Sequence, residues 1–486
     1  MRNCWPLVLI ASIAALGCAY AQTPATPTPA LRPFRVASDY PSIQAAVDSL
    51  PPTGGTVYLP EGRWVLDKAL DLTCRTYYDL PPQEREKRGL PVRIGSYIHL
   101  TGAGNGTILE GRMKDGPVID MTDSSYCTLS NFQIWSNTAQ CGILLARPDP
   151  KNRAGVLRSA GWDNFYNLWI NGSYSVANVY SLTSEVDKWW GCWFTNGAPD
   201  SYCFVFTHRN FAQITSPFVG ELAENVSCAD QRLFGCFFMH YCTPRDKANP
   251  GGATIYLRGY CEDITVTDCD FGSAGVKATL WLDCSQGPVK QLHVTNNRFE
   301  NSDTDLVFAN GTEDMASWQV TFRDNNCYGT QRRFLESPGA ANYWQVAGNL
   351  FYGATTPGLA PLHFGALNNS VVERNWFLNE PEANQGKVPQ VVVDGACADS
   401  EVQVPRSEDF QGKLVRSRLT ALNDNGTRRE YLGDPSAPVV LNLPLVDTAK
   451  LPNPKRGDLA LDSGANTKSG KPGLAVYDGE KWQYTN

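Results

Sequence analysis

A short motif recurs along most of this chain, and it constrains the fold more than any other feature of the sequence. It places a small or polar residue before a Cys or Asn, then any residue, then an aromatic side chain. Seven copies stand at residues 191–194, 235–238, 268–271, 296–299, 325–328, 348–351 and 374–377. Weaker copies at Asn131 and Asn167 extend the series upstream. A recurring pattern with this spacing indicates a repeat architecture, in which each unit packs mainly on its neighbours.

Alternating apolar residues precede each motif, as at Ile264 and Val266 or Leu292 and Val294, and this alternation predicts strands with one buried face. A second strand is predicted after the motifs at Ala253–Arg258, Ala278–Asp283, Asp305–Ala309, Pro361–Phe364 and Gln390–Asp394. Helical periodicity is absent from this region. Short strands in repeats without crossover helices predict an all-β fold, a parallel β-helix whose coils stack at about 4.8 Å.

One position of the motif is expected to form a column along a tight turn. The predicted members are Cys192, Cys236, Cys269, Asn297, Asn326, Asn349 and Asn375. Stacked Asn amides hydrogen-bond along such a column, and Asn tolerates the left-handed backbone of a turn. Parallel Cβ vectors are poorly oriented for disulfides, so the cysteines of the column are predicted to be mostly free, buried thiols.

The first 21 residues read as an export signal, with Arg2 before an apolar run and Ala19-Tyr20-Ala21 before the predicted cleavage at Gln22. The alternative is that Cys18 is the lipid-modified cysteine of a lipoprotein, although the order of Ala15 and Leu16 fits the residue pattern before such a cysteine poorly. Residues 22–34, rich in Pro and Thr, are predicted to be a linker. No later apolar run reaches the roughly 18 residues of a transmembrane helix. We therefore expect a secreted, extracellular or periplasmic protein.

Residues 35–410 are assigned to the β-helix. A short helix after Pro41-Ser42, with Ile43, Ala46 and Val47 on one face, is expected to plug its first coil. Residues 411–486 are assigned to a tail with a β-hairpin. The tail is expected either to cap the solenoid or to help trimers form, which leaves a monomer and a homotrimer open.

The content of charged residues restricts the classes of partner that this protein can bind. The formal net charge is −7 and only 19% of the residues are charged. A nucleic-acid binder shows a basic domain with clustered Lys and Arg, so nucleic acid is excluded as a partner.

Three segments carry a resemblance to a known family. Residues 39–48, 54–62 and 96–104 resemble the N-terminal cap and first coils of the pectate-lyase-like superfamily, which includes rhamnogalacturonase- and epimerase-like proteins. The resemblance implies a right-handed parallel β-helix that acts on acidic polysaccharides lying along one strand face. The Asn-Thr-Asp, Asp-Asp, Gly-His-Gly and Arg-Ile-Lys signatures of its polygalacturonase-type hydrolases are absent, which argues against the standard two-carboxylate hydrolase.

The catalytic candidates follow from aligning Ile255 with Leu280 as inward residues. Arg258 and Asp283 then point outward as neighbours. A lyase needs a base for the proton next to the substrate carboxylate and a positive group that stabilises the resulting anion. Arg258 or Lys277 is the predicted base or neutraliser, and Asp283 is predicted to hold a cation or to orient Arg258. A surface ion pair is the alternative interpretation of Arg258 and Asp283.

Substrate binding is assigned to Tyr256 and Trp281, which are expected to stack on sugar rings, and to His363, Asp394 and Arg245. No cofactor is predicted with certainty. Ca²⁺ stays open because paired oxygen ligands bind it, although no dense Asp cluster is present. The Cys and His spacing of a zinc site is absent.

Two function classes therefore remain. The first is a secreted carbohydrate-active enzyme on uronate-containing polysaccharide, a lyase or else a hydrolase or epimerase. The second is a non-catalytic β-helix for glycan binding, adhesion or surface scaffolding. The outward aromatic residues and Arg258 favour the enzyme, whereas the scarcity of His favours the second class.

Overall fold

The computed structural model describes most of the chain beyond the predicted signal peptide. The described residues are 33–51, 53–73, 83, 87, 97–149, 161–312, 315–353, 355–378, 387–424, 427–433, 445–450, 459–462, 466, 473–477 and 480–484. The signal peptide, Cys18 and nearly all of the linker lie outside these residues. No described helix is long and apolar enough to cross a membrane.

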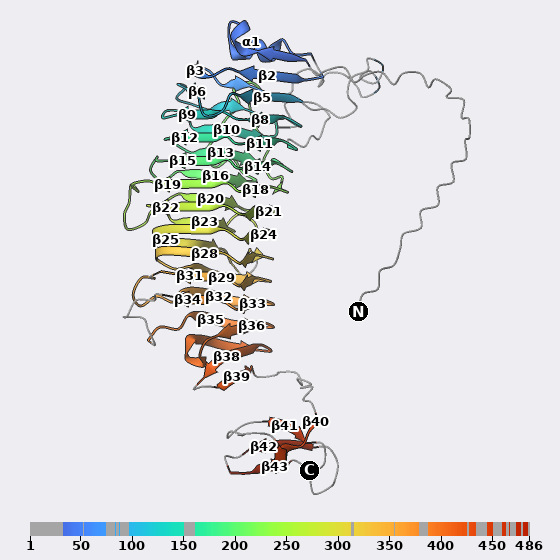
Figure 1. Cartoon of the computed structure of the whole chain (residues 1–486), viewed down its shortest axis with the longest axis vertical. Helices are drawn as coiled ribbons and strands as arrows, with labels where there is room; N and C mark the ends of the chain where they lie inside the picture. Colours follow the sequence, from blue (N-terminus) through green and yellow to red (C-terminus); the bar gives the residue numbers. More distant parts are fainter. Residues whose placement is uncertain are drawn as a thin grey trace, which may run out of the picture.

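The chain forms a parallel β-helix, which confirms the predicted fold class (Figure 1). Most coils contribute one strand to each of three sheets, here called I, II and III in chain order. Sheet I contains β1 (Phe34–Val36), β2 (Gly55–Leu59), β5 (Ile98–Gly102), β8 (Thr128–Ser130), β11 (Asn164–Tyr166), β14 (Lys188–Trp190), β18 (Arg232–Phe234), β21 (Cys261–Thr267), β24 (Val289–Thr295), β27 (Thr321–Arg323), β30 (Gln345–Ala347), β33 (Val371–Glu373), β36 (Glu401–Val404) and β38 (Arg418–Asp424).

Sheets II and III complete each coil. Sheet II contains β3 (Gly62–Leu66), β6 (Thr107–Gly111), β9 (Gln133–Ser136), β12 (Trp169–Gly172), β15 (Trp193–Asn196), β19 (Phe237–Tyr241), β22 (Asp270–Ala274), the first part of β25 (Arg298–Asn310), β28 (Asn326–Gln331), β31 (Leu350–Tyr352) and β34 (Trp376–Leu378). Sheet III contains β4 (Leu70–Asp71), β7 (Pro117–Asp120), β10 (Cys141–Ala146), β13 (Ala177–Leu182), β16 (Tyr202–Thr207), β20 (Ala253–Arg258), β23 (Ala278–Asp283), the second part of β25, β29 (Leu335–Asn342), β32 (Leu362–Asn368), β35 (Val391–Ala398) and β37 (Phe410–Val415). Two short strands, β17 (Cys228–Ala229) and β26 (Ser317–Trp318), pair beside sheet I.

The first coil is closed by the helix that the sequence predicts. The 3₁₀ turn η1 (Ala37–Asp39) precedes α1 (Ile43–Asp48), whose N-cap Ser42 accepts a hydrogen bond from the backbone N–H of Ala45. Ile43, Ala46 and Val47 are buried against the first coils. The short amphipathic helix therefore covers an apolar end that would otherwise face water.

The parallel stack continues past residue 410, where the sequence analysis placed its boundary. After η3 (Ser407–Asp409), β37 and β38 still pair in parallel with β35 and β36, and only β39 (Thr427–Leu432) turns back antiparallel. A separate four-stranded sheet contains β40 (Leu445–Val446), β41 (Leu459–Asp462), β42 (Gly473–Tyr477) and β43 (Trp482–Tyr484), with η4 (Thr448–Lys450) after β40. β41 and β42 form the predicted hairpin.

Identical side chains stack in the core because the register repeats from coil to coil. On sheet II the rings of Phe194, Phe238, Phe271 and Phe299 follow one another at 4.8, 4.7 and 4.7 Å. The twelve described cysteines are all free, and all but Cys242 are buried. This confirms the prediction of free thiols in the column.

The predicted column lies at the turn from sheet I to sheet II, with one correction. Asn325 rather than Asn326 belongs to it: the backbone N–H of Asn297 donates to Asn325 Oδ1 at 2.9 Å. Asn326 is exposed on β28, and Cys327 takes the aromatic position beside Phe299 and Phe351. The motif at 325–328 is therefore shifted by one residue, because two adjacent Asn residues fit the pattern equally well.

The left-handed backbone of this turn lies one residue before the column. Its φ values are positive at Gly191, Gly235, Asp268, Asn296, Asp324, Gly348 and Arg374, and at Asn131 and Asn167 upstream. Asn131 and Asn167 thus take the left-handed place, with Phe132 and Leu168 buried in the column position. The column Asn residues serve through their amides, not through left-handed backbone.

A second polar column lies at the turn from sheet III to sheet I of the next coil and contains two buried carboxyl groups. The backbone N–H of Asp163 donates to Asp187 Oδ1 at 3.2 Å, as Asn297 does to Asn325. Ser184 Oγ and Gln231 Nε2 donate to Asp187 Oδ2 at 2.6 and 3.0 Å. Burial raises the pKa of Asp187 to about 6, and burial together with the nearby Asp187 raises the pKa of Asp163.

We predict that Asn325→Ala lowers the free energy of unfolding by roughly 2 to 4 kcal/mol, because it leaves the buried amide groups of its neighbours unpaired. Asn325 Nδ2 donates to Val294 O and to Asn349 Oδ1, both at 3.0 Å. Asn326→Ala is the matched control and is expected to change stability by less than about 0.5 kcal/mol. Denaturant unfolding measures both, and an equal loss in the two variants would contradict the assignment.

We also predict that the contribution of Asp187 to stability falls as pH rises from about 4 to above 6. The folded protein holds the Asp187 proton more tightly than the unfolded chain, where the Asp pKa is near 3.9, so deprotonation opposes folding. Deprotonation of Asp187 is expected to lower the free energy of unfolding by roughly 2 to 3 kcal/mol. Asp187→Asn is expected to flatten the dependence and raise the melting temperature at pH 7. Thermal melts across this pH range test it, and an unchanged slope would count against it.

Candidate functional site

The outer face of sheet III carries the predicted site residues in the register that the sequence predicts. Tyr256 pairs with Trp281, and Arg258 pairs with Asp283. The row through Tyr256 and Trp281 continues to Phe308, Glu336 and His363 on the next strands. Side chains from five successive coils therefore form one line along the outside of the solenoid.

Residues 208–227, which connect β16 to β17, cover the upstream part of this face. Ile214 and Leu222 from this segment pack with outward residues of β10, β13, β16 and β20 in a second buried apolar cluster, separate from the core. The Phe211 ring lies 5.7 Å from that of Tyr180 and 5.6 Å from that of Tyr256. Tyr256 is 5% exposed as a result, so it does not present the sugar-stacking surface that the sequence analysis assigned to it.

Asp283 is likewise enclosed rather than open to a substrate. Its carboxylate accepts hydrogen bonds from Tyr256 Oη at 2.5 Å, from Asn310 Nδ2 at 2.9 Å and from the backbone N–H of Ser285 at 3.0 Å. Burial raises the pKa of Asp283, but these hydrogen bonds outweigh it and hold the pKa below its ordinary value. Asp283 Oδ2 also lies 3.8 Å from Arg258 Nε, as the predicted orienting role requires, so its catalytic role stays a prediction.

Arg258 and Lys277 keep cationic groups that no carboxylate fully engages. Arg258 Nε lies 3.8 Å from Asp283 Oδ2, and its guanidinium stands 4.8 Å from the centroid of the Phe211 ring. Among the described residues the Arg258 side chain makes no hydrogen bond. Lys277 Nζ lies 4.2 Å from the centroid of the Phe308 ring. Arg258 thus forms the ion pair with Asp283 that the alternative interpretation predicts, and Lys277 lies against Phe308, the neighbour of Trp281 on the next strand.

Arg245 lies on the Lys277 side of this group, because its partner Asp200 accepts from the backbone N–H of Gly251, whose carbonyl accepts from the backbone N–H of Lys277. It belongs to the connection between β19 and β20, and its Nε is 3.6 Å from Asp200 Oδ2. Its side chain is 77% exposed. The structure therefore does not bring Arg245 together with Arg258, although both were expected in one binding surface.

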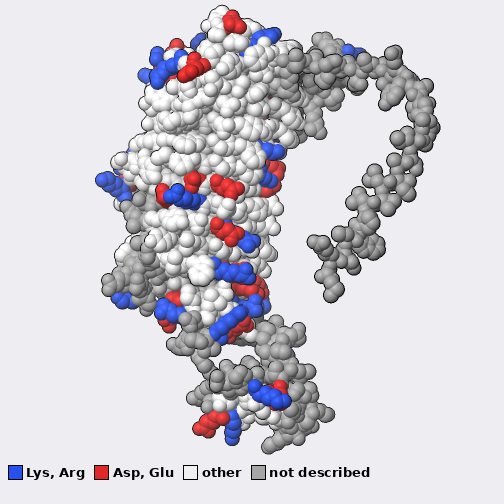
Figure 2. All heavy atoms as spheres, viewed as in Figure 1, with Lys and Arg blue, Asp and Glu red and all other residues white. Residues whose placement is uncertain are grey.

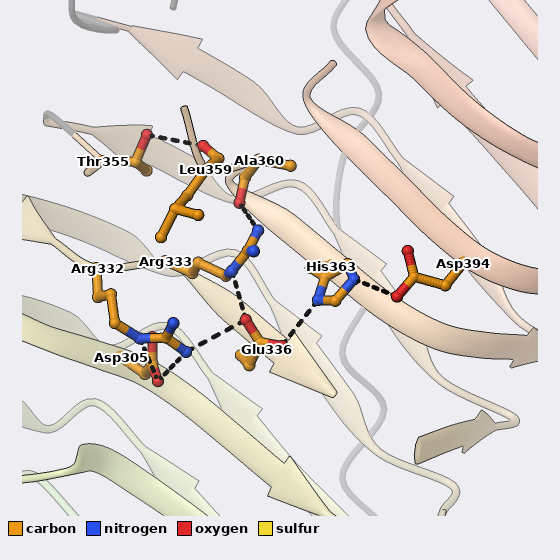
Figure 3. Close-up of polar contacts among 9 residues, drawn as sticks. All are labelled: Asp305, Arg332, Arg333, Glu336, Thr355, Leu359, Ala360, His363 and Asp394. Atoms are coloured by element: carbon orange, nitrogen blue, oxygen red, sulfur yellow. Dashed lines mark hydrogen bonds and ion pairs between the residues drawn. The ribbon is translucent and has the colours of Figure 1, made fainter. Parts of the chain in front are cut away.

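The largest charged network on this face lies downstream, on β25, β29, β32 and β35 (Figure 3). Arg332 Nη2 bridges Asp305 Oδ2 at 2.8 Å and Glu336 Oε2 at 3.2 Å. Arg333 also contacts Glu336, and it donates to the backbone carbonyl of Ala360 at 2.8 Å. Burial raises the pKa of Asp305 despite its ion pair with Arg332.

His363 lies between two carboxylates in this network. Its Nδ1 is 2.7 Å from Glu336 Oε1, and its Nε2 is 2.9 Å from Asp394 Oδ2. The Glu336 side chain is 8% exposed and that of Asp394 is 64% exposed, so one partner is held in place and the other faces solvent. Two such contacts require a proton on both ring nitrogens or on one carboxyl group.

Sequence reasoning predicted His363 and Asp394 but missed Asp305, Arg332, Arg333 and Glu336. For Arg332, Arg333 and Glu336 the reason is that no strand was predicted after the motif at 325–328, because Pro338-Gly339 interrupts β29 and reads as a turn. Asp305 lay in a predicted strand but was given no role. A register shift between Ser337 and Ala340 accommodates those two residues within the strand. The available signal was the adjacent apolar pair Phe334-Leu335 between charged residues, which does not show strand alternation.

Charges elsewhere are mostly paired. In the view of Figure 2, most Lys and Arg side chains stand beside an acidic one, and no continuous basic field is present on that face. The described residues contain no group of three or more His, Cys, Asp or Glu side chains arranged to hold a metal ion.

Comparison with known proteins adds likenesses of fold. No family model and no curated protein matches the chain. ORF18 of Geobacillus virus E2 is 12% identical over 93% of this chain and 86% of that one, with a TM-score of 0.42. The Dettilon tailspike protein is 10% identical over 79% and 68%, with a TM-score of 0.47. An alginate lyase from Paenibacillus sp. str. FPU-7 is 12% identical over 71% and 95%, with a TM-score of 0.40.

Proposed function

We propose that this protein is an exported carbohydrate-active enzyme that cleaves uronate-containing polysaccharide by β-elimination, with His363 at the reaction centre. One observation carries the proposal: a buried carboxylate holds Nδ1 of a histidine whose second ring nitrogen, Nε2, contacts the solvent-exposed carboxylate of Asp394. The outward row of Trp281 and Phe308 leads to this histidine along the same face.

Glu336 orients His363 in this proposal. A buried carboxylate that accepts a hydrogen bond from Nδ1–H fixes the tautomer and leaves Nε2 as the working nitrogen, which is the logic of acid–base triads. Arg332 and Arg333 keep Glu336 in its place. Asp394 meets Nε2 from the solvent side, and its exposed side chain is free to turn away when a sugar chain arrives.

The reaction then follows with all atoms accounted for. His363 Nε2 takes the proton from the carbon next to the uronate carboxylate. The released electron pair forms a carbon–carbon double bond while the bond to the departing sugar oxygen breaks. The imidazolium returns the proton to that oxygen. The step needs a cation that stabilises the negative charge developing on the uronate carboxylate, and we assign this role to Arg332, whose side chain is 39% exposed.

A non-catalytic glycan-binding protein is the second candidate. The observation that favours it is that Arg332, Arg333, Asp305 and Glu336 already neutralise one another. Such a network also serves simply to stabilise charged side chains on the outside of the solenoid.

We predict that the mature protein releases unsaturated products from at least one uronate polysaccharide. The double bond conjugated with the carboxylate absorbs ultraviolet light, so a panel of pectate, alginate and glycosaminoglycan substrates reveals the activity directly, with reducing-end assays run in parallel. Reducing ends without ultraviolet absorbance would indicate hydrolysis. Binding without any cleavage would support the second candidate and overturn the enzyme.

We predict that His363→Gln lowers kcat by about 100-fold or more, since an acid–base group typically contributes that much. The amide keeps much of the polar contact with Glu336 but cannot exchange a proton. His293→Gln is the matched control, because His293 lies on β24 in sheet I, away from the site. Steady-state kinetics with folded variants measures the effect. Near-normal turnover of His363→Gln would remove His363 from the mechanism.

A further inference from the structure

The covered part of sheet III brings residues 208–227 against Arg258: the Phe211 ring lies 4.8 Å from its guanidinium, and His208 Nδ1 lies 3.0 Å from its carbonyl. We infer that residues 208–227 close one end of the substrate groove, and that Arg258, Lys277 and Trp281 form a terminal subsite there for an acidic sugar. The inference rests on the proposed function, because it takes a uronate polymer as the substrate. It adds where the end of that polymer binds and what products are released.

The closing segment is anchored at several points. Ser216 Oγ donates to Asp120 Oδ2 at 2.5 Å, and the backbone N–H of Ala223 donates to the carbonyl of Arg147 at 2.8 Å. His208 Nδ1 contacts the Arg258 carbonyl at 3.0 Å. Its apolar residues are buried in the second cluster, so moving the segment would expose that cluster to water. The segment therefore forms a fixed wall across the row that leads toward His363.

The cations at the foot of this wall have room for a ligand carboxylate. Asp283 lies 3.8 Å from Arg258 Nε but accepts its hydrogen bonds from Tyr256 and Asn310, and Asp305 pairs with Arg332. Arg258 makes no hydrogen bond with the described residues, although a guanidinium matches a carboxylate in two-point geometry. Its side chain is 21% exposed, so a ligand can reach it. This chemistry selects a sugar acid over a neutral sugar.

Trp281 completes the subsite and fixes its position. Its ring lies 4.9 Å from that of Tyr256 on the wall side and 6.0 Å from that of Phe308 on the open side. Its Nε1 donates to Asn310 Oδ1 at 2.8 Å, which fixes the ring orientation. A partly exposed ring held in this way offers a flat surface to the apolar face of a sugar.

The distance from this subsite to His363 sets the product length. Trp281 and His363 are separated by three strand spacings, roughly 14 Å. A polymer whose end rests against the wall therefore places a bond only a few sugar units away at the reaction centre. The enzyme is expected to release short oligosaccharides of uniform length from a chain end, instead of cutting at random.

The experiment combines product analysis with one variant. The wild-type protein is expected to yield one short product size from the first minutes, with little loss of polymer viscosity. Arg258→Gln is expected to raise KM for the polymer about tenfold or more while kcat changes little, because it loses the charge-assisted contact and keeps the fold. Arg298→Gln is the matched control, since Arg298 is exposed on sheet II.

Random products with a rapid fall in viscosity would overturn the closed end and leave the lyase standing. If no polymer is cleaved, the proposed function fails, and calorimetry with oligogalacturonate and oligomannuronate still decides the subsite. Weaker binding by Arg258→Gln than by the wild type or Arg298→Gln would support it. Equal binding by all three, or equal binding of the corresponding neutral oligosaccharides, would overturn it.

Discussion

Parallel pairing of each strand with its counterpart one coil later is the interaction on which this structure depends. The register repeats, so a residue stacks on the residue in the same place of the next coil, as the four Phe rings of sheet II do at 4.7 to 4.8 Å. The same rule aligns the Asn amides at one turn and the Asp carboxyls at another. It also aligns the outward row from Tyr256 to His363, so the candidate site is a consequence of the stacking.

The outer surface shows what this architecture does with charge. Most coils need few ion pairs because stacked apolar and amide columns satisfy their interiors, which accounts for a charged fraction of only 19%. Charges on the outside tend to stand in opposite pairs. The sheet III face departs from this pattern at two places: a histidine between carboxylates, and two cations without a full partner. Departures of this kind mark candidate functional sites, because ordinary packing does not require them.

The site was partly predictable from sequence. Aligning inward residues was enough to pair Tyr256 with Trp281 and Arg258 with Asp283, because the two strands have the same length and the same alternation. Glu336 was not predicted as a site residue because Pro338-Gly339, which is typical of a turn, lies within its strand β29. The sequence placed Asn326 in the column instead of Asn325 for a similar local reason, because a pattern of residue classes does not distinguish two adjacent asparagines.

The sequence by itself determined the solenoid, its capping helix, the free thiols and the side of the strand on which each site residue lies, because all of these follow from local periodicity and spacing. Only the tertiary structure decided which part of the sheet III face is open. Residues 208–227 fold back over strands that are distant in sequence, and what holds them is an apolar cluster assembled from four separate coils. No local pattern encodes that contact. The enclosure of Asp283 and the assembly of the charged network around His363 therefore emerge only when the coils are stacked.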